Sequence, residues 1–209
     1  MRVKICGLTE PDAVRHAAGL GAAYVGLVFF PRSPRHLTPE TAASLIAAAP
    51  PGVTTVALLV DPDDELVERV AALPVGMLQL HGHETPARTA EIRARAGLPV
   101  MKAIGIGDAD DLAQIASYEA VADQILVDAP PPAGAGRPGG NAAAFDWRLI
   151  EGRRWKRPWM LAGGLRPENV AEAVRLTGAR QVDVSSGVES APGVKDPARV
   201  AAFIAAARG

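Results

Sequence analysis

The strongest constraint on the fold of this chain is a regular alternation of short apolar runs and helical patterns along its whole length. Several apolar runs are nearly continuous, which is typical of parallel strands that are buried on both faces. The sequence therefore predicts eight parallel strands. They are Val3–Cys6, Tyr24–Phe29, Thr54–Val60, Met77–Leu80, Val100–Ile104, Gln124–Asp128, Trp159–Ala162 and Gln181–Val184.

Helices with readable starts lie between these strands. Thr9 with Asp12 three residues later resembles a capping box. Thr38 and Asp61 each precede a proline, as an N-cap precedes a proline in the first helical turn, and Pro167 predicts a further start. Eight strand–helix units in order favour a compact single-domain (β/α)8 TIM barrel over residues 1–209, although such barrels typically have about 250 residues. A doubly wound open sheet is the alternative.

Composition excludes several classes of function. The 22 Lys and Arg residues against 23 Asp and Glu residues give a net charge of −1, which offers no general field for nucleic acid. No apolar run reaches the 18 residues of a membrane-spanning helix, and the N-terminus does not resemble a secretory leader. One cysteine cannot form an internal disulfide, so we expect a cytoplasmic protein. We also expect a monomer or a homodimer.

Two groups suited to proton transfer end predicted strands. Cys6, the only cysteine, ends the first strand, and Asp128 ends the sixth after an apolar run. In a barrel both would face the mouth formed by the strand C-termini, where catalytic residues gather. Cys6 could also be a nucleophile or a small core residue, and Asp128 could cap a neighbouring loop. We favour acid–base roles because the two groups would flank one substrate.

Glycine-rich loops follow the last two predicted strands. Gly163 and Gly164 follow the seventh strand, and Ser185, Ser186 and Gly187 follow the eighth. Glycine lets backbone N–H groups approach an anion, and these two loops are the usual phosphate site of a TIM barrel. The alternative is a pair of tight turns. The pattern predicts a small phosphorylated substrate.

Other polar residues would line the same mouth. Arg35 lies in a loop stiffened by two prolines and suits carboxylate recognition, whereas Arg32 is expected to be solvated. Gln79 and His81 lie at the end of the fourth strand and are candidates for substrate contact. His81 and His83 have no further ligand cluster, so we expect no metal site.

These residues lie within motifs that resemble a known family along essentially the whole chain. The chain resembles phosphoribosylanthranilate isomerase, the (β/α)8 enzyme of tryptophan biosynthesis. The similarity rests on several motifs in order: residues 4–9 (KICGLT), 26–29 (GLVF), 33–35 (SPR), 78–82 (LQLHG), 126–128 (LVD), 145–147 (FDW), 161–165 (LAGGL), 167–170 (PENV), 183–189 (DVSSGVE) and 193–196 (GVKD).

The resemblance implies an Amadori rearrangement in which Cys6 is the general base and Asp128 the general acid. Arg35 corresponds to the position associated with the anthranilate carboxylate. A base role would require a lowered pKa at Cys6, and Lys4 points to the same side of the strand by the two-residue period.

The chain departs from the family in the long loop over Ala129–Ala144. Gly139–Ala144 lacks the third glycine and the polar pair of the family's usual run, so we expect a stiffer loop or weaker substrate binding. One alternative is the related isomerase of histidine biosynthesis, which has an aspartate at the position of Cys6. The other is a barrel that binds a phosphorylated metabolite without turnover.

Overall fold

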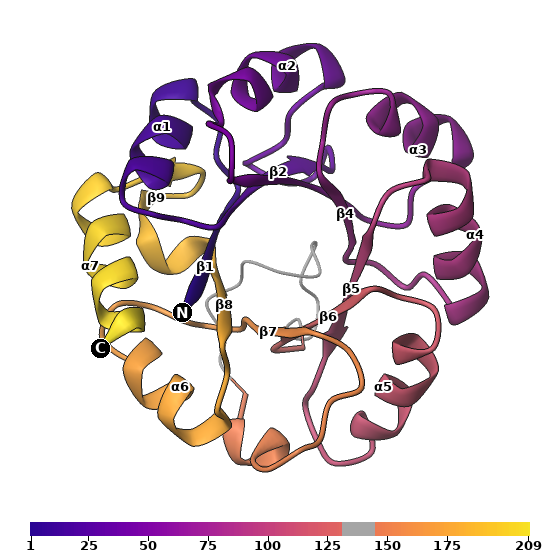
Figure 1. The fold of residues 1–209 in the computed structure, drawn as a ribbon, viewed down its shortest axis with the longest axis vertical. Helices are drawn as coiled ribbons and strands as arrows, with labels where there is room; N and C mark the ends of the chain where they lie inside the picture. Colours follow the sequence, from indigo (N-terminus) through magenta and orange to yellow (C-terminus); the bar gives the residue numbers. More distant parts are fainter. Residues whose placement is uncertain (131–144) are drawn as a thin grey trace.

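A computed structural model of the chain describes residues 1–130 and 145–209. It contains a closed barrel of eight parallel strands in sequence order, and β1 pairs with β8 to close it (Figure 1). The predicted TIM barrel is thereby confirmed, and the open-sheet alternative is wrong. The strands are β1 (Arg2–Cys6), β2 (Tyr24–Phe29), β3 (Thr54–Leu59), β4 (Met77–Leu80), β5 (Val100–Gly105), β6 (Gln124–Asp128), β7 (Trp159–Leu161) and β8 (Gln181–Val184).

Helices surround the barrel as a ring (Figure 1). The α-helices of the described residues are α1 (Pro11–Gly19), α2 (Pro39–Ala48), α3 (Asp64–Ala71), α4 (Pro86–Ala96), α5 (Leu112–Glu119), α6 (Val170–Thr177) and α7 (Pro197–Arg208). The expected series of eight strand–helix units is wrong in one place. Between β6 and β7, the described residues contain only a short 3₁₀ helix, η1 (Trp147–Ile150).

The predicted helix starts are correct only in part. Thr38 caps α2, and its side chain and that of Thr41 bond reciprocally to each other's backbone N–H groups. Glu10, rather than Thr9, precedes α1, without a side-chain cap. Asp63 caps α3 in place of Asp61, because the Asp61 carboxylate accepts the backbone N–H of His83 instead. The turn at Pro167 precedes α6, which begins three residues later.

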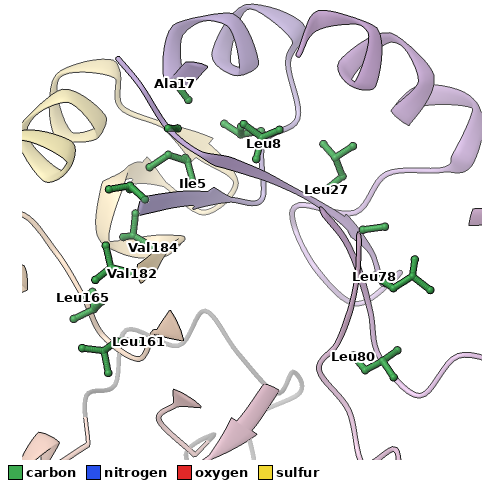
Figure 2. Close-up of a cluster of buried hydrophobic side chains, with 14 of the residues drawn as sticks. Ile5, Leu8, Ala17, Leu27, Leu78, Leu80, Leu161, Leu165, Val182 and Val184 are labelled. Atoms are coloured by element: carbon green, nitrogen blue, oxygen red, sulfur yellow. The ribbon is translucent and has the colours of Figure 1, made fainter. Parts of the chain in front are cut away.

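Two apolar layers hold the barrel together. The larger layer lies between the strands and the helices, and Figure 2 shows part of it around Ile5, Leu27 and Val184. A smaller cluster fills the interior of the barrel and includes Met101 and Met160. Because successive strand residues point to opposite faces, Lys4 and Cys6 both lie on the interior side while Ile5 packs outward.

A short hairpin follows the last barrel strand. The 3₁₀ helix η2 (Ser186–Val188) leads into β9 (Glu189–Ala191), which pairs in antiparallel fashion with β10 (Val194–Lys195). This hairpin brings Glu189 and Lys195 back toward the mouth of the barrel. Most of the long loop that follows β6, with the departure at Gly139–Ala144, lies outside the described residues.

Candidate active site

Cys6 ends β1 at the mouth and is buried against Val28 and Leu58. Two residues earlier, the fully buried Lys4 bonds through Nζ to Oδ1 of Asp183 on β8 at 2.9 Å. Lys4 lies close enough to Cys6 for its charge and a hydrogen bond to favour the thiolate. Lys4 therefore lies on the same side of β1 as Cys6, as the two-residue period of a strand predicts, and its charge acts on the thiol.

The acidity of Cys6 differs from the expectation. Burial raises the pKa of the Cys6 thiol, and the charge of Asp183 adds to that effect. Lys4 and Lys195 act in the opposite direction but do not outweigh burial. The lowered pKa that a base role would require is therefore not present in the unliganded protein, because desolvation disfavours the charged thiolate.

Asp128 ends β6 within a chain of polar side chains. His81 Nε2 lies 3.1 Å from Asp128 Oδ2, and Gln79 Nε2 lies 2.9 Å from His81 Nδ1. The other oxygen of Asp128 accepts the backbone N–H of Ala129 at 2.8 Å. Gln79 is fully buried and reaches the mouth only through His81, so the expected direct substrate contact does not fit its burial.

Arg35 lies at the mouth and is itself paired. Its Nε and Nη2 each donate to Glu189 at 2.7 Å, and both side chains are only 5% exposed. Lys195 Nζ bonds to the same carboxylate at 2.7 Å and to the backbone oxygen of Ser185 at 3.0 Å. Burial acts to raise the pKa of Glu189, but the two cations outweigh it and hold that pKa below its ordinary value.

The loops after β7 and β8 are in close contact. Gly163 has φ of +82°, and a Cβ there would lie 2.6 Å from the backbone nitrogen of Ala129 beside Asp128. A Cβ on Gly187 would overlap the carbonyl oxygen of Leu165. Both positions therefore exclude a side chain. Among the described residues, the N–H groups of Gly163 and Gly164 have no hydrogen-bond acceptor.

A cavity of about 320 Å³ opens beside His81 and Asp128. Its walls come from the ends of β4, β5 and β6 and from Gln114 and Tyr118 on α5. No group of three or more His, Cys, Asp or Glu residues in the described ranges could hold a metal ion. Within the same ranges, no helix is long and apolar enough to cross a membrane.

The partners of these residues carry little signal of their role in the sequence pattern. Asp183 bonds to Lys4, 179 residues away along the chain, and Glu189 bonds to Arg35, 154 residues away. Lys195 bonds in turn to Glu189. One indication is the spacing of Glu189 and Lys195 around a glycine, which permits a hairpin that returns both side chains to one site.

The comparisons with known proteins agree over the full chain. Residues 3–206 match the family model described as N-(5'phosphoribosyl)anthranilate (PRA) isomerase. A relative of that name from Cereibacter sphaeroides is 66% identical over 209 residues, covering 100% of this chain and 99% of the relative. One from Paracoccus denitrificans is 61% identical over 206 residues, covering 98% and 96%.

Solved structures give the same result. The phosphoribosyl anthranilate isomerase of Thermotoga maritima has a TM-score of 0.89 at 36% identity, covering 100% of this chain and 99% of that one. A phosphoribosyl anthranilate isomerase in complex with reduced 1-(o-carboxyphenylamino)-1-deoxyribulose 5-phosphate has a TM-score of 0.87 at 35% identity and the same coverage. Identity and coverage of this extent show that the chain belongs to the N-(5'-phosphoribosyl)anthranilate isomerase family.

Proposed function

We propose that this protein converts N-(5-phospho-β-D-ribosyl)anthranilate into 1-(2-carboxyphenylamino)-1-deoxy-D-ribulose 5-phosphate during tryptophan biosynthesis. The observation that carries the proposal is the placement of one buried thiol and one carboxyl at the same barrel mouth, at the ends of β1 and β6, in a chain of this family. The reaction is an Amadori rearrangement, which needs an acid at the ring oxygen and a base at C2′.

Asp128 is the proposed acid. It gives a proton to the furanose ring oxygen as the C1′–O bond breaks, and the anthranilate nitrogen supplies its lone pair to form the Schiff base. Asp128 is suited to this task because Ala129 and His81 hold both of its oxygens in place. A fixed carboxyl loses little orientational freedom in the transition state.

Cys6 is the proposed base. The thiolate removes the proton at C2′, and the electron pair left on C2′ forms the C1′–C2′ double bond of an enolamine, which then tautomerises to the ketone. Because burial raises the pKa of Cys6, thiolate formation depends on the nearby cations Lys4 and Lys195. The substrate nitrogen accepts and returns the electrons, so the proposal needs no cofactor.

The phosphate is proposed to bind between the loops after β7 and β8. The N–H groups of Gly163 and Gly164 have no acceptor within residues 1–130 and 145–209, and Ser185, Ser186 and Gly187 form the adjacent loop. Binding energy from this remote group can hold the reacting sugar between base and acid. The bound phosphorylated ligand of a relative at 35% identity supports a substrate of this class.

Arg35 is the proposed partner of the anthranilate carboxylate. Among the described residues, Glu189 takes the N–H of Nε and one N–H of Nη2, so Nη1 and the second N–H of Nη2 are left for the substrate. Glu189 thereby fixes the guanidinium plane, which favours carboxylate recognition over free rotation of the arginine. His81 borders the cavity beside Asp128 and is a further proposed contact of the substrate.

The experiment that tests the assignment is steady-state turnover of freshly made phosphoribosylanthranilate, followed by fluorescence, with the product identified by mass. C6A and D128N should each lose at least about 100-fold in kcat, as is typical for removal of a proton-transfer group. D12N, on the exposed face of α1, is the matched control and should retain full activity. Near-normal turnover by C6A or D128N would remove that residue from its role, and binding without turnover by the wild type would favour a non-catalytic barrel.

The same proposal includes the oligomeric state of the protein and its location in the cell. We expect a monomer or a homodimer, and a relative from Thermotoga maritima is described as dimeric. Balanced charge supports the absence of nucleic-acid binding. The single, buried, unpaired cysteine fits the reducing conditions of the cytoplasm.

A further inference from the structure

Gln79, His81 and Asp128 form a linear chain of polar side chains from β4 to the end of β6. The chain runs from Gln79 Nε2 to His81 Nδ1 at 2.9 Å and from His81 Nε2 to Asp128 Oδ2 at 3.1 Å. Gln79 has no exposed surface, and the side chains of His81 and Asp128 are 11% and 13% exposed. The two ends therefore differ: one is sealed in the barrel and the other faces the mouth.

An acid that works near pH 7 must carry a proton when the substrate binds. At pH 7 a carboxylic acid side chain is ordinarily ionised, so it needs a source for the proton that it gives. An imidazole ordinarily exchanges its proton in the range around neutral pH. A carboxyl hydrogen-bonded to an imidazole can therefore receive its proton directly through the ring.

The amide of Gln79 fits both protonation states of the ring. With its nitrogen toward Nδ1, Gln79 donates to a neutral ring whose Nε2–H points at Asp128. The amide oxygen of Gln79 is buried and has no hydrogen-bond partner among the described residues. A half-turn of the amide would present that oxygen to Nδ1, where it accepts the second N–H of an imidazolium ring.

We propose that His81 is a positioning residue that holds the catalytic proton for Asp128, with Gln79 supporting the ring in either state. The inference rests on the proposed role of Asp128 as the acid. The Nε2–H bond of the imidazolium breaks as the proton moves to Asp128 Oδ2. Asp128 then passes this proton to the ring oxygen of the substrate. The neutral imidazole takes a new proton from water after turnover.

The other charged groups near His81 are already paired. Lys102 on β5 bonds to Glu84 at 2.7 Å and to the carbonyl oxygen of Gly82 at 2.8 Å. Tyr118 on α5 donates to the backbone oxygen of Glu84. The exposed His83 side chain bonds through Nδ1 to the Asp61 carboxylate. Among the described residues, Asp128 is therefore the one charged group bonded to the His81 ring.

The test compares H81Q with the wild type over a range of pH. The Gln amide can still donate to Asp128, but it cannot hold an exchangeable proton. We expect kcat at pH 7 to fall at least about tenfold, as for a weakened general acid, with a smaller change in KM. The limb of the kcat/KM profile that reports the acid should move to lower pH while the other limb stays.

H83Q is the matched control, because the His83 side chain is 94% exposed two residues away. Its rate and both limbs should equal those of the wild type. The phosphate of the substrate titrates in the same range, but identically with every variant. If H81Q retains both limbs and its turnover, the inference is overturned.

The two proposals fail separately. Turnover by D128N would overturn the role of Asp128, whereas an inactive D128N with a normal H81Q would overturn only the role of His81. If H81Q does not fold by circular dichroism, Q79M decides, since it keeps His81 but removes both amide partners. Q79M should lower kcat and move the same limb, and an unchanged profile would refute the inference.

Discussion

The ion pair between Lys4 and Asp183 joins the first and last strands inside the barrel, and its loss should be measurable as a loss of stability. The two side chains are 0% and 9% exposed, and Nζ lies 2.9 Å from Oδ1. D183N keeps the shape of the side chain but removes its negative charge. The Lys4 ammonium would then remain buried without its counter-ion.

The expected loss of stability in D183N follows from the burial of the ion pair. Removing one partner of a buried ion pair destabilises a protein by about 3–5 kcal/mol. In a domain of 150–250 residues, 1 kcal/mol shifts Tm by about 2–4 °C. D183N should therefore lower Tm by roughly 6–20 °C.

The direction in which pH changes the stabilisation by the Lys4–Asp183 pair follows from the pKa of Lys4. Burial acts to lower the pKa of Lys4, but Asp183 and Cys6 raise it above its ordinary value overall. A cation with a raised pKa contributes its full stabilisation below the pKa of the unfolded chain and loses it only in strong alkali. The Tm difference between D183N and the wild type should consequently stay constant from about pH 6 to pH 9.

Scanning calorimetry of the wild type, D183N, K4M and the double variant K4M/D183L measures the coupling. The double variant buries no unpaired charge, so it should recover at least half of the Tm lost by D183N. A Tm for D183N within about 2 °C of the wild type would refute the reasoning. So would a double variant whose loss equals the sum of the two single losses.

The remaining predictions concern the thiol, the phosphate loop and the hairpin. K4M should move the ultraviolet thiolate transition of Cys6 to higher pH, because Lys4 lowers the pKa of that thiol; an unchanged midpoint would contradict the contact. G163V should raise KM at least about tenfold, because a side chain there meets Ala129, and an unaltered KM would argue against the phosphate site. E189Q should unfold at a lower temperature than the wild type at pH 7. A carboxyl with a lowered pKa stabilises the fold above the pKa of the unfolded chain and loses that effect as it is protonated. The Tm difference between E189Q and the wild type should therefore shrink below about pH 4.

The sequence predicted the barrel strands to within one residue at each end, because strands buried on both faces give long apolar runs bounded by turns. The helix starts were predicted less accurately than the strands. Asp61 precedes a proline, as an N-cap would, but its carboxylate is used by His83 in the next loop. Such competition between local and distant partners cannot be read from spacing.

The site was predictable as a set of positions but not as a set of bonds. Cys6 and Asp128 were found because strand ends meet at one mouth. The pairing of Arg35 with Glu189 and the contact of His81 with Asp128 depend on rotamers and on neighbours up to 154 residues away. The raised pKa of Cys6 was missed because a sequence pattern does not give the depth of burial.

The closure of the barrel by β1 and β8 has a consequence for the order of events during synthesis. Lys4 leaves the ribosome 179 residues before its only described counter-ion, Asp183. At about 5–20 residues per second, the delay is roughly 10–35 s. Throughout that interval the nascent chain carries an ammonium group that burial would penalise. The first strand therefore stays solvated and unpaired on its β8 side until the last strand emerges, and the window in which the chain needs protection from aggregation spans nearly the whole of translation.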